Sequence, residues 1–292
     1  MESVLIFSQF KNFYRTAILS YIQGIVDNDP KRRFYLTGSS QFGLLHSVSQ
    51  SLAGRSAVFE LLPLSLSEIS EISEMIAQDS TDEILYKGFY PAVWSGKNLP
   101  KFLYPNNVKT YVERDVRDIL AIKNLDLFQR FLRLCAGRIG SIFNASELSN
   151  ELGVAVNTVN ARMSVLQASY LIYLLPPIYS DSRKRLTKSP KIYFTDCGLA
   201  SYLLDIDSPQ TLNRDKMRGH LFENMVIIDS IKDAFNAGKN GGFYFYRDSN
   251  GNEVDLLVKN GSGYDCYEIK SAATFHPDFI KGIRNFENIA VR

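Results

Sequence analysis

Four charged residues near the C-terminal end of the chain have the types and spacing that metal-dependent phosphodiester chemistry needs. Glu253 and Asp255 alternate along one expected strand, and Glu268 and Lys270 alternate along the next. Two carboxylates repel each other unless a cation or a proton lies between them, and oxygen-only ligands suit Mg²⁺ or Mn²⁺. An ion held by Asp255 and Glu268 would polarise a phosphodiester and acidify a bound water. This pair is therefore the candidate metal site.

The register of the expected hairpin decides whether these side chains meet. Turn residues separate three segments that read as strands, namely 243–247, 253–259 and 264–270. If 260–263 is a four-residue loop, Lys259 pairs with Tyr264, and the same count places Asp255 opposite Glu268. Directly opposed residues have Cβ atoms about 5 Å apart, and alternate residues share one face of a strand. The count therefore predicts that the acids and Lys270 gather on one face.

Two further residues could complete the site, and one reading needs no ion at all. The segment Met217–Ala234 reads as an amphipathic helix that contains Glu223, which could reach the ion directly or through water. Lys270 could orient the attacking water or steady the charge of the phosphate. In the alternative, the hairpin presents a solvated face, on which Glu253 forms a cross-strand ion pair with Lys270.

A helix-turn-helix pattern covers residues 143–169. Asn144 and Glu147 have the spacing of a capping box, Gly153 allows a sharp turn, and Asn157 can cap the second helix. Val159, Met163 and Leu166 then form its core stripe.

The remaining face of that second helix is polar and could meet phosphates or base edges. The side chains expected to point outward are Asn157, Asn160, Arg162 and Ser164. A basic run follows where a wing normally lies, and it consists of Arg183, Lys184, Arg185, Lys188 and Lys191. A basic surface attracts a polyanion, so DNA is the expected partner. Helix-turn-helix units also serve as packing modules or protein contacts, and this alternative stays open.

Composition predicts the number of domains, the state of the cysteines and the location of the protein. The chain has 292 residues, 45% hydrophobic and 22% charged, which predicts a globular protein of two or three domains. The net charge of +2 is uninformative, but seven acids and no basic residue lie between Ser56 and Tyr86. Cys135, Cys197 and Cys266 have neither disulfide nor metal spacing, so reduced thiols are expected. Without a secretory signal or an apolar run of about 18 residues, we expect a cytoplasmic protein and no membrane contact.

The other segments give plainer expectations. Residues 33–37 read as a short buried strand and Ala57–Leu62 as a second strand, and an acidic helix follows to about Gln78. The Pro-rich and aromatic segment from Tyr86 to Pro105 reads as a loop-rich linker carrying Trp94. Residues 106–136 read as helical, and the charged cluster 113–118 reads as a solvated helix face with ion pairs.

These residues resemble two known families. The order of Glu223, Asp255 and Glu268-Ile269-Lys270 resembles the layout of PD-(D/E)XK nucleases. A larger resemblance spans nearly the whole chain, to prokaryotic AAA-like ATPases whose C-terminal end carries a domain of unknown function numbered 4143. Six blocks carry it: YLTGSSQF (35–42), SLAGR (51–55), LLPLSLSEI (61–69), YVERDVRDI (111–119), KSPKIYFTDCGL (188–199) and GHLFEN (219–224).

The AAA-like resemblance has consequences for nucleotide binding. It implies that Ser39 or Ser40 could sense a γ-phosphate and that Arg55 could be a sensor or trans-acting arginine. No G-x-x-x-x-G-K-[ST] sequence occurs in the chain, so no loop is available to cradle the phosphates. Residues 5–9 lack the acid that would hold Mg²⁺. We therefore expect vestigial sensor residues and no ATP binding by this chain, although the family is ATPase-like.

Together the residues and the resemblance predict a multidomain protein with α/β and α+β parts. The expected domains are an AAA-like ATPase remnant with lid helices (1–105), a helical and winged-helix domain (106–200) and an incomplete PD-(D/E)XK nuclease-like α/β domain (201–292). The chain is expected to be a fragment or degenerate member that lacks a preceding P-loop segment. Its expected function is that of a DNA-binding protein with a Mg²⁺-dependent nuclease-like domain, which cleaves DNA if its site is active. The alternative is a non-catalytic DNA-binding or protein-interaction module with an inert nuclease-like fold, with a protein partner or a second copy as its target.

Overall fold

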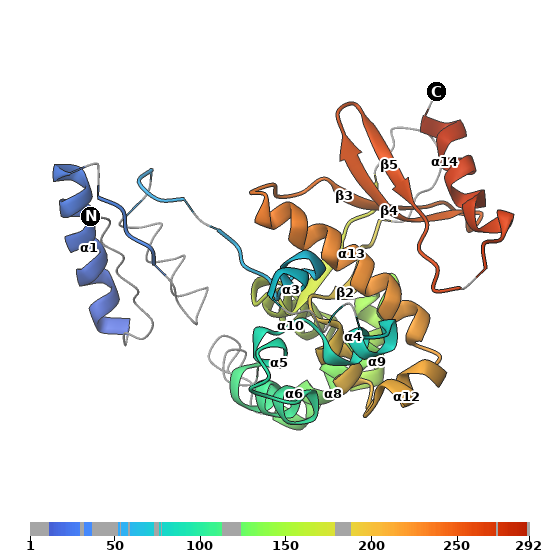
Figure 1. Ribbon diagram of the computed structural model, residues 1–292, viewed down its shortest axis with the longest axis horizontal. Helices are drawn as coiled ribbons and strands as arrows, with labels where there is room; N and C mark the ends of the chain where they lie inside the picture. The colour runs from blue at the N-terminus through green and yellow to red at the C-terminus, as the bar shows by residue number, and fades with distance from the viewer. Residues whose placement is uncertain are drawn as a thin grey trace. The chain divides into compact units, whose positions relative to one another are not determined.

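The computed structural model divides into two compact units, Met1–Glu60 and Leu61–Arg292. It describes residues 12–29, 32–36, 52, 54–57, 59–72, 76, 78–112, 124–178, 188–272 and 274–290. In these ranges the chain forms helices and two small antiparallel sheets, which is an α+β architecture (Figure 1). Among the described helices, none has the length and apolar character that crossing a membrane requires.

The first unit contains helix α1 (Asn12–Asn28), whose Leu19 and Ile22 are buried together with Leu52. The strand expected at 33–37 is not formed by its described residues, nor is the one expected at 57–62. A strand needs a hydrogen-bonded neighbour, and an apolar run does not supply one. In the first segment Tyr35 is 54% exposed, so the burial expected for 33–37 is wrong at that residue.

Helices form most of the second unit up to residue 168. In chain order they are α3 (Leu66–Ile72), α4 (Thr81–Lys87), α5 (Pro91–Trp94), α6 (Pro100–Asn107), the π-helical turn η2 (Val108–Val112), α8 (Leu125–Ala136), α9 (Ala145–Leu152) and α10 (Val156–Ala168). The charged cluster 113–118 lies outside the described residues.

The expected linker between Tyr86 and Pro105 is wrong, because this segment belongs to the core. Trp94 is buried, and its indole nitrogen donates a hydrogen bond to the Gly88 carbonyl at 2.8 Å. Pro91 and Pro100 stand at the first positions of α5 and α6. Proline is favoured there because its missing N–H would have no helical partner anyway. The prolines that suggested a loop are thus the start signals of two helices.

The predicted helix-turn-helix forms with one correction. The side chain of Asn144 caps α9 by accepting from the amides of Ser146 and Glu147, and Gly153 ends the helix in the left-handed conformation with φ +67°. Asn157 does not cap the next helix, because α10 begins at Val156 and its cap position is Ala155, two residues earlier than expected. Its expected stripe of Val159, Met163 and Leu166 is buried.

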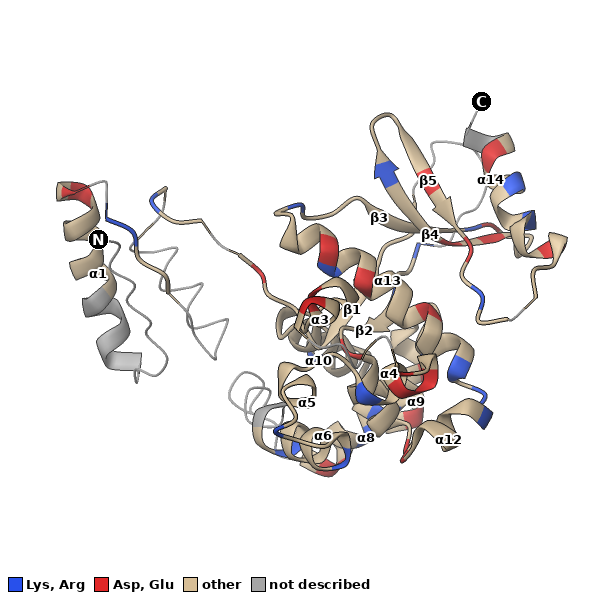
Figure 2. Cartoon of the chain, viewed as in Figure 1, with Lys and Arg blue, Asp and Glu red and all other residues tan. Residues whose placement is uncertain are grey.

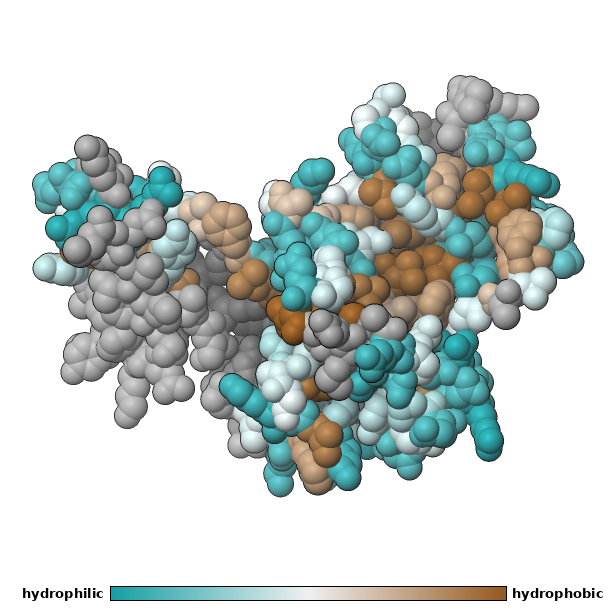
Figure 3. Space-filling model, viewed as in Figure 1, coloured by the Kyte–Doolittle hydropathy of each residue, from teal (hydrophilic) through white to brown (hydrophobic). Residues whose placement is uncertain are grey.

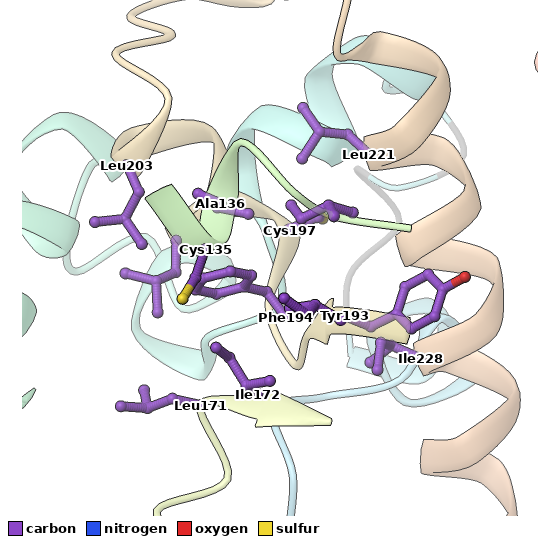
Figure 4. Close-up of a cluster of buried hydrophobic side chains, with 14 of the residues drawn as sticks. Cys135, Ala136, Leu171, Ile172, Tyr193, Phe194, Cys197, Leu203, Leu221 and Ile228 are labelled. Atoms are coloured by element: carbon purple, nitrogen blue, oxygen red, sulfur yellow. The ribbon is translucent and has the colours of Figure 1, made fainter. Parts of the chain in front are cut away.

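Two strands and three helices follow and close the main core. Strand β1 (Ile172–Leu175) pairs antiparallel with β2 (Lys191–Phe194), and α11 (Cys197–Leu203), α12 (Pro209–Arg214) and α13 (Arg218–Asn236) come next. The close-up in Figure 4 shows β2 beside α13, with the Tyr193 ring reaching toward that helix. Cys135 and Cys197 are buried free thiols, as expected, and Cys266 is free and partly buried.

The C-terminal part is a three-stranded antiparallel sheet in the order β3 (Phe243–Arg247), β4 (Glu253–Asn260) and β5 (Gly263–Tyr267). Phe245 and Leu256 join the main core, while Tyr246 and Val254 pack with Phe286 of the last helix. That helix, α14 (Lys281–Ala290), follows the short 3-10 helix η3 (Pro277–Ile280). Strands β3 and β4 are therefore covered on both faces, whereas exposed and half-buried residues alternate along β5.

The hairpin register is confirmed where the ladder runs, but the ladder stops short of the site. Lys259 pairs with Tyr264 as expected, and the pairing continues to Leu256 opposite Tyr267. Strand β5 ends there, so Asp255 and Glu268 are not a ladder pair, and the strand expected to reach residue 270 is three residues shorter.

A β-bulge lies at this position on the other side of β4. Leu257 is the partner of Tyr244 and Val254 is the partner of Tyr246, so two residues of β4, Asp255 and Leu256, oppose one residue of β3. Bulges of this kind occur beside functional sites, where they change the direction of a side chain. The simple alternation assumed for the acids is therefore broken at Asp255.

Candidate functional site

Asp255 occupies the centre of the candidate site. It is 5% exposed, and its Oδ2 accepts a hydrogen bond from the Ile269 amide at 2.9 Å. The Lys270 ammonium lies 3.2 Å from the same oxygen. The chain after β5 thus turns its main chain and Lys270 toward Asp255, although the β4–β5 ladder has already ended.

Glu268 is joined to Asp255 through this lysine. The Nζ of Lys270 lies 2.6 Å from Oε1 of Glu268, while Oε2 of Glu268 is buried without a hydrogen-bond partner. Burial raises the pKa of Glu268, and Lys270 opposes that shift. The pKa of Lys270 is raised, because its carboxylate partners outweigh its partial burial. The predicted trio of Asp255, Glu268 and Lys270 is therefore brought together, through an ammonium.

Glu223 reaches the same region from α13. The Tyr193 hydroxyl on β2 donates to Glu223 Oε1 at 2.5 Å. A side-chain carbon at Gly140 would lie 3.2 Å from that oxygen, so the chain leaves little room beside it. Burial raises the pKa of Glu223, and the neighbouring Lys191 ammonium counteracts this. The helix glutamate of the predicted layout is thus held by a tyrosine.

Lys191 is the residue that the sequence reasoning placed wrongly. It was counted in a basic wing, but its side chain is 2% exposed and points at the acids. Its Nζ lies 3.5 Å from Glu223, 3.9 Å from Asp255 and in direct contact with Glu253. Burial lowers the pKa of Lys191, but the three carboxylates outweigh this and raise it overall. The available signal was its position at the start of the apolar run KIYF, which forms a fully buried strand.

Glu253 therefore has partners other than those expected. It contacts Lys191 and also pairs with Arg247 across the β3–β4 ladder, at 3.2 Å. The cross-strand pair with Lys270 is not formed, because Lys270 binds Asp255 and Glu268 instead. We call Glu223, Glu253, Asp255 and Glu268 the acid cluster. Figure 2 shows acidic residues along β4.

The geometry limits how an ion could bind. In the described part of the chain, no three His, Cys, Asp or Glu side chains converge on a point that could hold a metal. Three members of the acid cluster converge on Lys191, and two on Lys270. A metal at Asp255 and Glu268 would have to complete its shell with water, as Mg²⁺ commonly does.

The expected nucleic-acid face is only partly formed. Asn157 and Asn160 are exposed on α10, and Lys188 is exposed before β2. Arg162 is buried, which corrects the expectation that it points outward: it is 6% exposed and stacks over the Phe131 ring at 5.9 Å. A period of 3.6 residues places position 162 on the same helix face as the core residues Val159 and Leu166. Arg183, Lys184 and Arg185 lie outside the described residues.

Three family models match segments of the chain. Residues 14–70 match an AAA domain, residues 78–210 a domain of unknown function numbered 8612, and residues 218–291 a domain of unknown function numbered 4143. The outer two support an AAA-like ATPase family member. This agrees with the resemblance drawn from the sequence blocks.

The chain is also similar to curated proteins, at low identity. Uncharacterized proteins of Mycobacterium bovis and Mycobacterium tuberculosis are each 27% identical over 87% of this chain and 55% of their own length. One of Methanocaldococcus jannaschii is 24% identical over 79% of the chain and 54% of its own length. The chain thus spans about half the length of the curated relatives that it matches. No solved structure matches it.

Within the segment that matches the AAA domain, only one expected nucleotide-sensing residue can be placed. Arg55 is exposed, and its Nε lies 2.6 Å from Asp27 on α1. Ser39 and Ser40 lie outside the described residues. The expectations of a vestigial sensor and of no ATP binding therefore stay predictions.

Proposed function

We propose that the Leu61–Arg292 unit is a DNA-binding module with a metal-dependent, PD-(D/E)XK-type nuclease-like site at Asp255, Glu268 and Lys270. The observation that carries this proposal is the buried Oε2 of Glu268, which has no hydrogen-bond partner. A buried polar atom is costly without a partner. A divalent cation beside Asp255 would satisfy it.

The ligand chemistry fits a hard cation. Asp255 and Glu268 offer carboxylate oxygens, which are the donors that Mg²⁺ and Mn²⁺ take. Such an ion, when bound, would polarise a phosphodiester and lower the pKa of a coordinated water.

The remaining residues would position the reactants. Lys270 is 39% exposed on its side chain and already contacts Asp255 and Glu268. Its ammonium could therefore turn from these carboxylates to a phosphate oxygen, where developing negative charge needs a donor. Tyr193 holds Glu223 by a hydrogen bond, which fixes the orientation of the carboxylate behind the site.

DNA binding is supported by the order of the helices and strands that precede the site in the sequence. Helices α8, α9 and α10 are followed by the antiparallel strands β1 and β2. Residue Ile142 adds an isolated antiparallel bridge to Lys191 at the start of β2. This order suits a winged helix, in which the second helix of the turn enters the major groove. Asn157 and Asn160 would then face the bases or phosphates, and Arg183, Lys184, Arg185 and Lys188 the backbone.

Loss of the Glu268 carboxylate should weaken Mn²⁺ binding at least tenfold, or about 1.4 kcal/mol. Isothermal titration of the full chain with Mn²⁺ would compare the wild type with Glu268→Gln, and Glu287→Gln on the exposed side of α14 serves as the matched control. Asp255→Asn should in addition lower DNA cleavage by about 100-fold, with circular dichroism unchanged. Equal Mn²⁺ affinity in wild type and Glu268→Gln would refute the metal site.

A second candidate function is a binding module with an inert nuclease-like fold. It is favoured by Lys191, which already neutralises three of the four acids. An apolar area in the middle of the visible face of this unit suits a protein partner (Figure 3). Elsewhere on the same unit, Leu99 and Phe102 at α6 are each 58% exposed.

The two candidates differ in their response to salt and substitution. For DNA binding without cleavage, affinity should fall steeply with salt, and the log–log slope should shrink by about 0.9 for each phosphate contact removed. Neutralising Arg183, Lys184 and Arg185 to glutamine tests this by fluorescence anisotropy, with Lys97 and Lys101 changed to glutamine as the control. If the triple variant keeps the wild-type slope, the basic run does not contact DNA.

A further inference from the structure

Lys191 is a buried cation fixed at the meeting point of three carboxylates. Its side chain is 2% exposed, and Glu223, Glu253 and Asp255 all lie within 4 Å of its ammonium. Removing an ammonium from water is costly, and only close opposite charges offset that cost. These carboxylates come from α13 and β4, while Lys191 comes from β2.

The two oxygens of Asp255 face two different lysines, and each lysine has its own carboxylate partners. Oδ1 faces Lys191 at 3.9 Å, whereas Oδ2 faces Lys270 at 3.2 Å and the Ile269 amide at 2.9 Å. Lys191 also contacts Glu223 and Glu253. Lys270 also contacts Glu268, whose Oε2 is the buried oxygen without a partner.

A carboxylate shared in this way is what a two-metal centre uses. Two ions about 3.5–4 Å apart are held by a common ligand and divide the attacking and leaving oxygens between them. In this chain the Lys191 ammonium occupies one of the two positions beside Asp255, the one that faces Oδ1. The other is bordered by Lys270, which is 39% exposed and has room to move.

The main chain holds Lys191 in place. Lys191 pairs with Leu175 in the β1–β2 ladder and with Ile142 on the other side of β2. The ammonium also lies over the Phe245 ring, 5.3 Å from its centre. Displacement by an ion would leave an ammonium buried among apolar groups, which is strongly unfavourable. Lys270 has no comparable restraint from a described strand.

We propose that Lys191 is a positioning residue that takes the place of a second divalent ion, so that the centre binds one metal, at Asp255 and Glu268. This rests on the metal site of the proposed function. Lys191 holds the Glu223 and Asp255 carboxylates in their orientation, and the centre operates with one metal and one fixed ammonium.

Metal stoichiometry tests this directly. The full chain would be titrated with Mn²⁺, and bound ions counted by calorimetry and by the loss of the free Mn²⁺ signal in electron paramagnetic resonance. The wild type should bind one ion. Lys191→Gln should bind two, because Glu223, Glu253 and Asp255 lose their cation, and Lys191→Arg should again bind one. Lys259→Gln, an exposed position on the same β4 strand, should match the wild type.

The outcomes separate this inference from the proposed function. One ion in both the wild type and Lys191→Gln would overturn the role of Lys191 and leave the metal site standing. No ion in the wild type but one in Lys191→Gln would refute the site at Asp255 and Glu268, and would still support Lys191 as the substitute cation. Two ions in the wild type would overturn the inference.

A second measurement covers the case in which Lys191→Gln does not fold. Nitrogen-15 NMR of lysine ammonium groups detects slowly exchanging, buried amines, and the Lys191 signal is assigned by its loss in Lys191→Arg. We expect this signal to persist when the wild type is saturated with Mg²⁺. Its disappearance on adding Mg²⁺ would mean that the ion displaces Lys191, contrary to the proposal.

Discussion

Replacing Asp196 with alanine should lower the free energy of unfolding of the Leu61–Arg292 unit by about 3–5 kcal/mol. Asp196 is fully buried. Its Oδ1 caps α11 by accepting from the Leu199 amide at 2.6 Å, and its Oδ2 accepts from the Phe89 amide at 2.5 Å. The change therefore leaves two buried N–H groups unsatisfied, each of which costs about 1–3 kcal/mol.

The same change also isolates a buried cation. Lys232 is 2% exposed and contacts the Leu64 carbonyl at 2.9 Å and the Phe89 ring. Burial lowers the pKa of Lys232, and Asp196 is the charge that most opposes this lowering. Without Asp196 the pKa should fall further. Between this lowered pKa and the usual lysine value of 10.5, the unfolded chain binds more protons than the folded one, so stability rises with pH.

Urea unfolding followed by circular dichroism measures both effects. The loss in Asp196→Ala should be largest at neutral pH and should shrink as the pH approaches 10. Asp205→Asn is the matched control, because Asp205 lies just after the same helix with a 73% exposed side chain that pairs with Arg133 at the surface. Its loss should stay below about 1 kcal/mol. A loss below 1 kcal/mol for Asp196→Ala would contradict the assigned role.

Gly198→Ala should cost about 3 kcal/mol or prevent folding, because α11 passes too close to its neighbours for a methyl group. An added Cβ would lie 2.2 Å from the Tyr104 hydroxyl oxygen and 2.8 Å from the Gly88 Cα. Tyr104 is 1% exposed, and its hydroxyl donates to the Lys87 carbonyl at 2.7 Å, so the ring cannot withdraw. Helix propensity alone would favour alanine by about 1 kcal/mol.

Gly137→Ala is the control for this prediction. Gly137 ends α8 with φ −66°, and an added Cβ would meet its nearest neighbours at 3.7 and 3.8 Å. That change should be neutral within about 0.5 kcal/mol. Thermal unfolding of both variants, followed by differential scanning calorimetry, gives the comparison. Equal melting temperatures for Gly198→Ala and the wild type would show that the close approach is absent.

The acid cluster shows how much of a hairpin register can be predicted by counting residues from the turn. Counting from the turn correctly paired Lys259 with Tyr264, because the period of a strand is a local property. The loop expected at 260–263 is shorter, since Asn260 and Gly263 also pair. The count failed at Asp255, where β4 bulges and β5 has ended. Even so, Asp255, Glu268 and Lys270 came together, through the Ile269 amide and the lysine ammonium.

Prolines and lysines were misread for a shared reason. Pro91 and Pro100 begin helices that bury Trp94 and Tyr104, although the sequence suggested a linker. Lys191 is inside, although it stood in a basic run. Local composition describes the average setting of a residue type. Whether a particular lysine is buried depends on which acids the fold brings to it.

The sequence by itself determined the features that depend on neighbouring residues: the cap at Asn144, the left-handed turn at Gly153, the helix that carries Glu223 and the hairpin pairs from Lys259–Tyr264 to Leu256–Tyr267. Only the tertiary structure decided that Lys191, 64 positions before Asp255, supplies the charge among the acids. The physical reason is that a carboxylate cluster requires a counter-charge but does not specify its source. That source is set by the packing of β2 against α13 and β4.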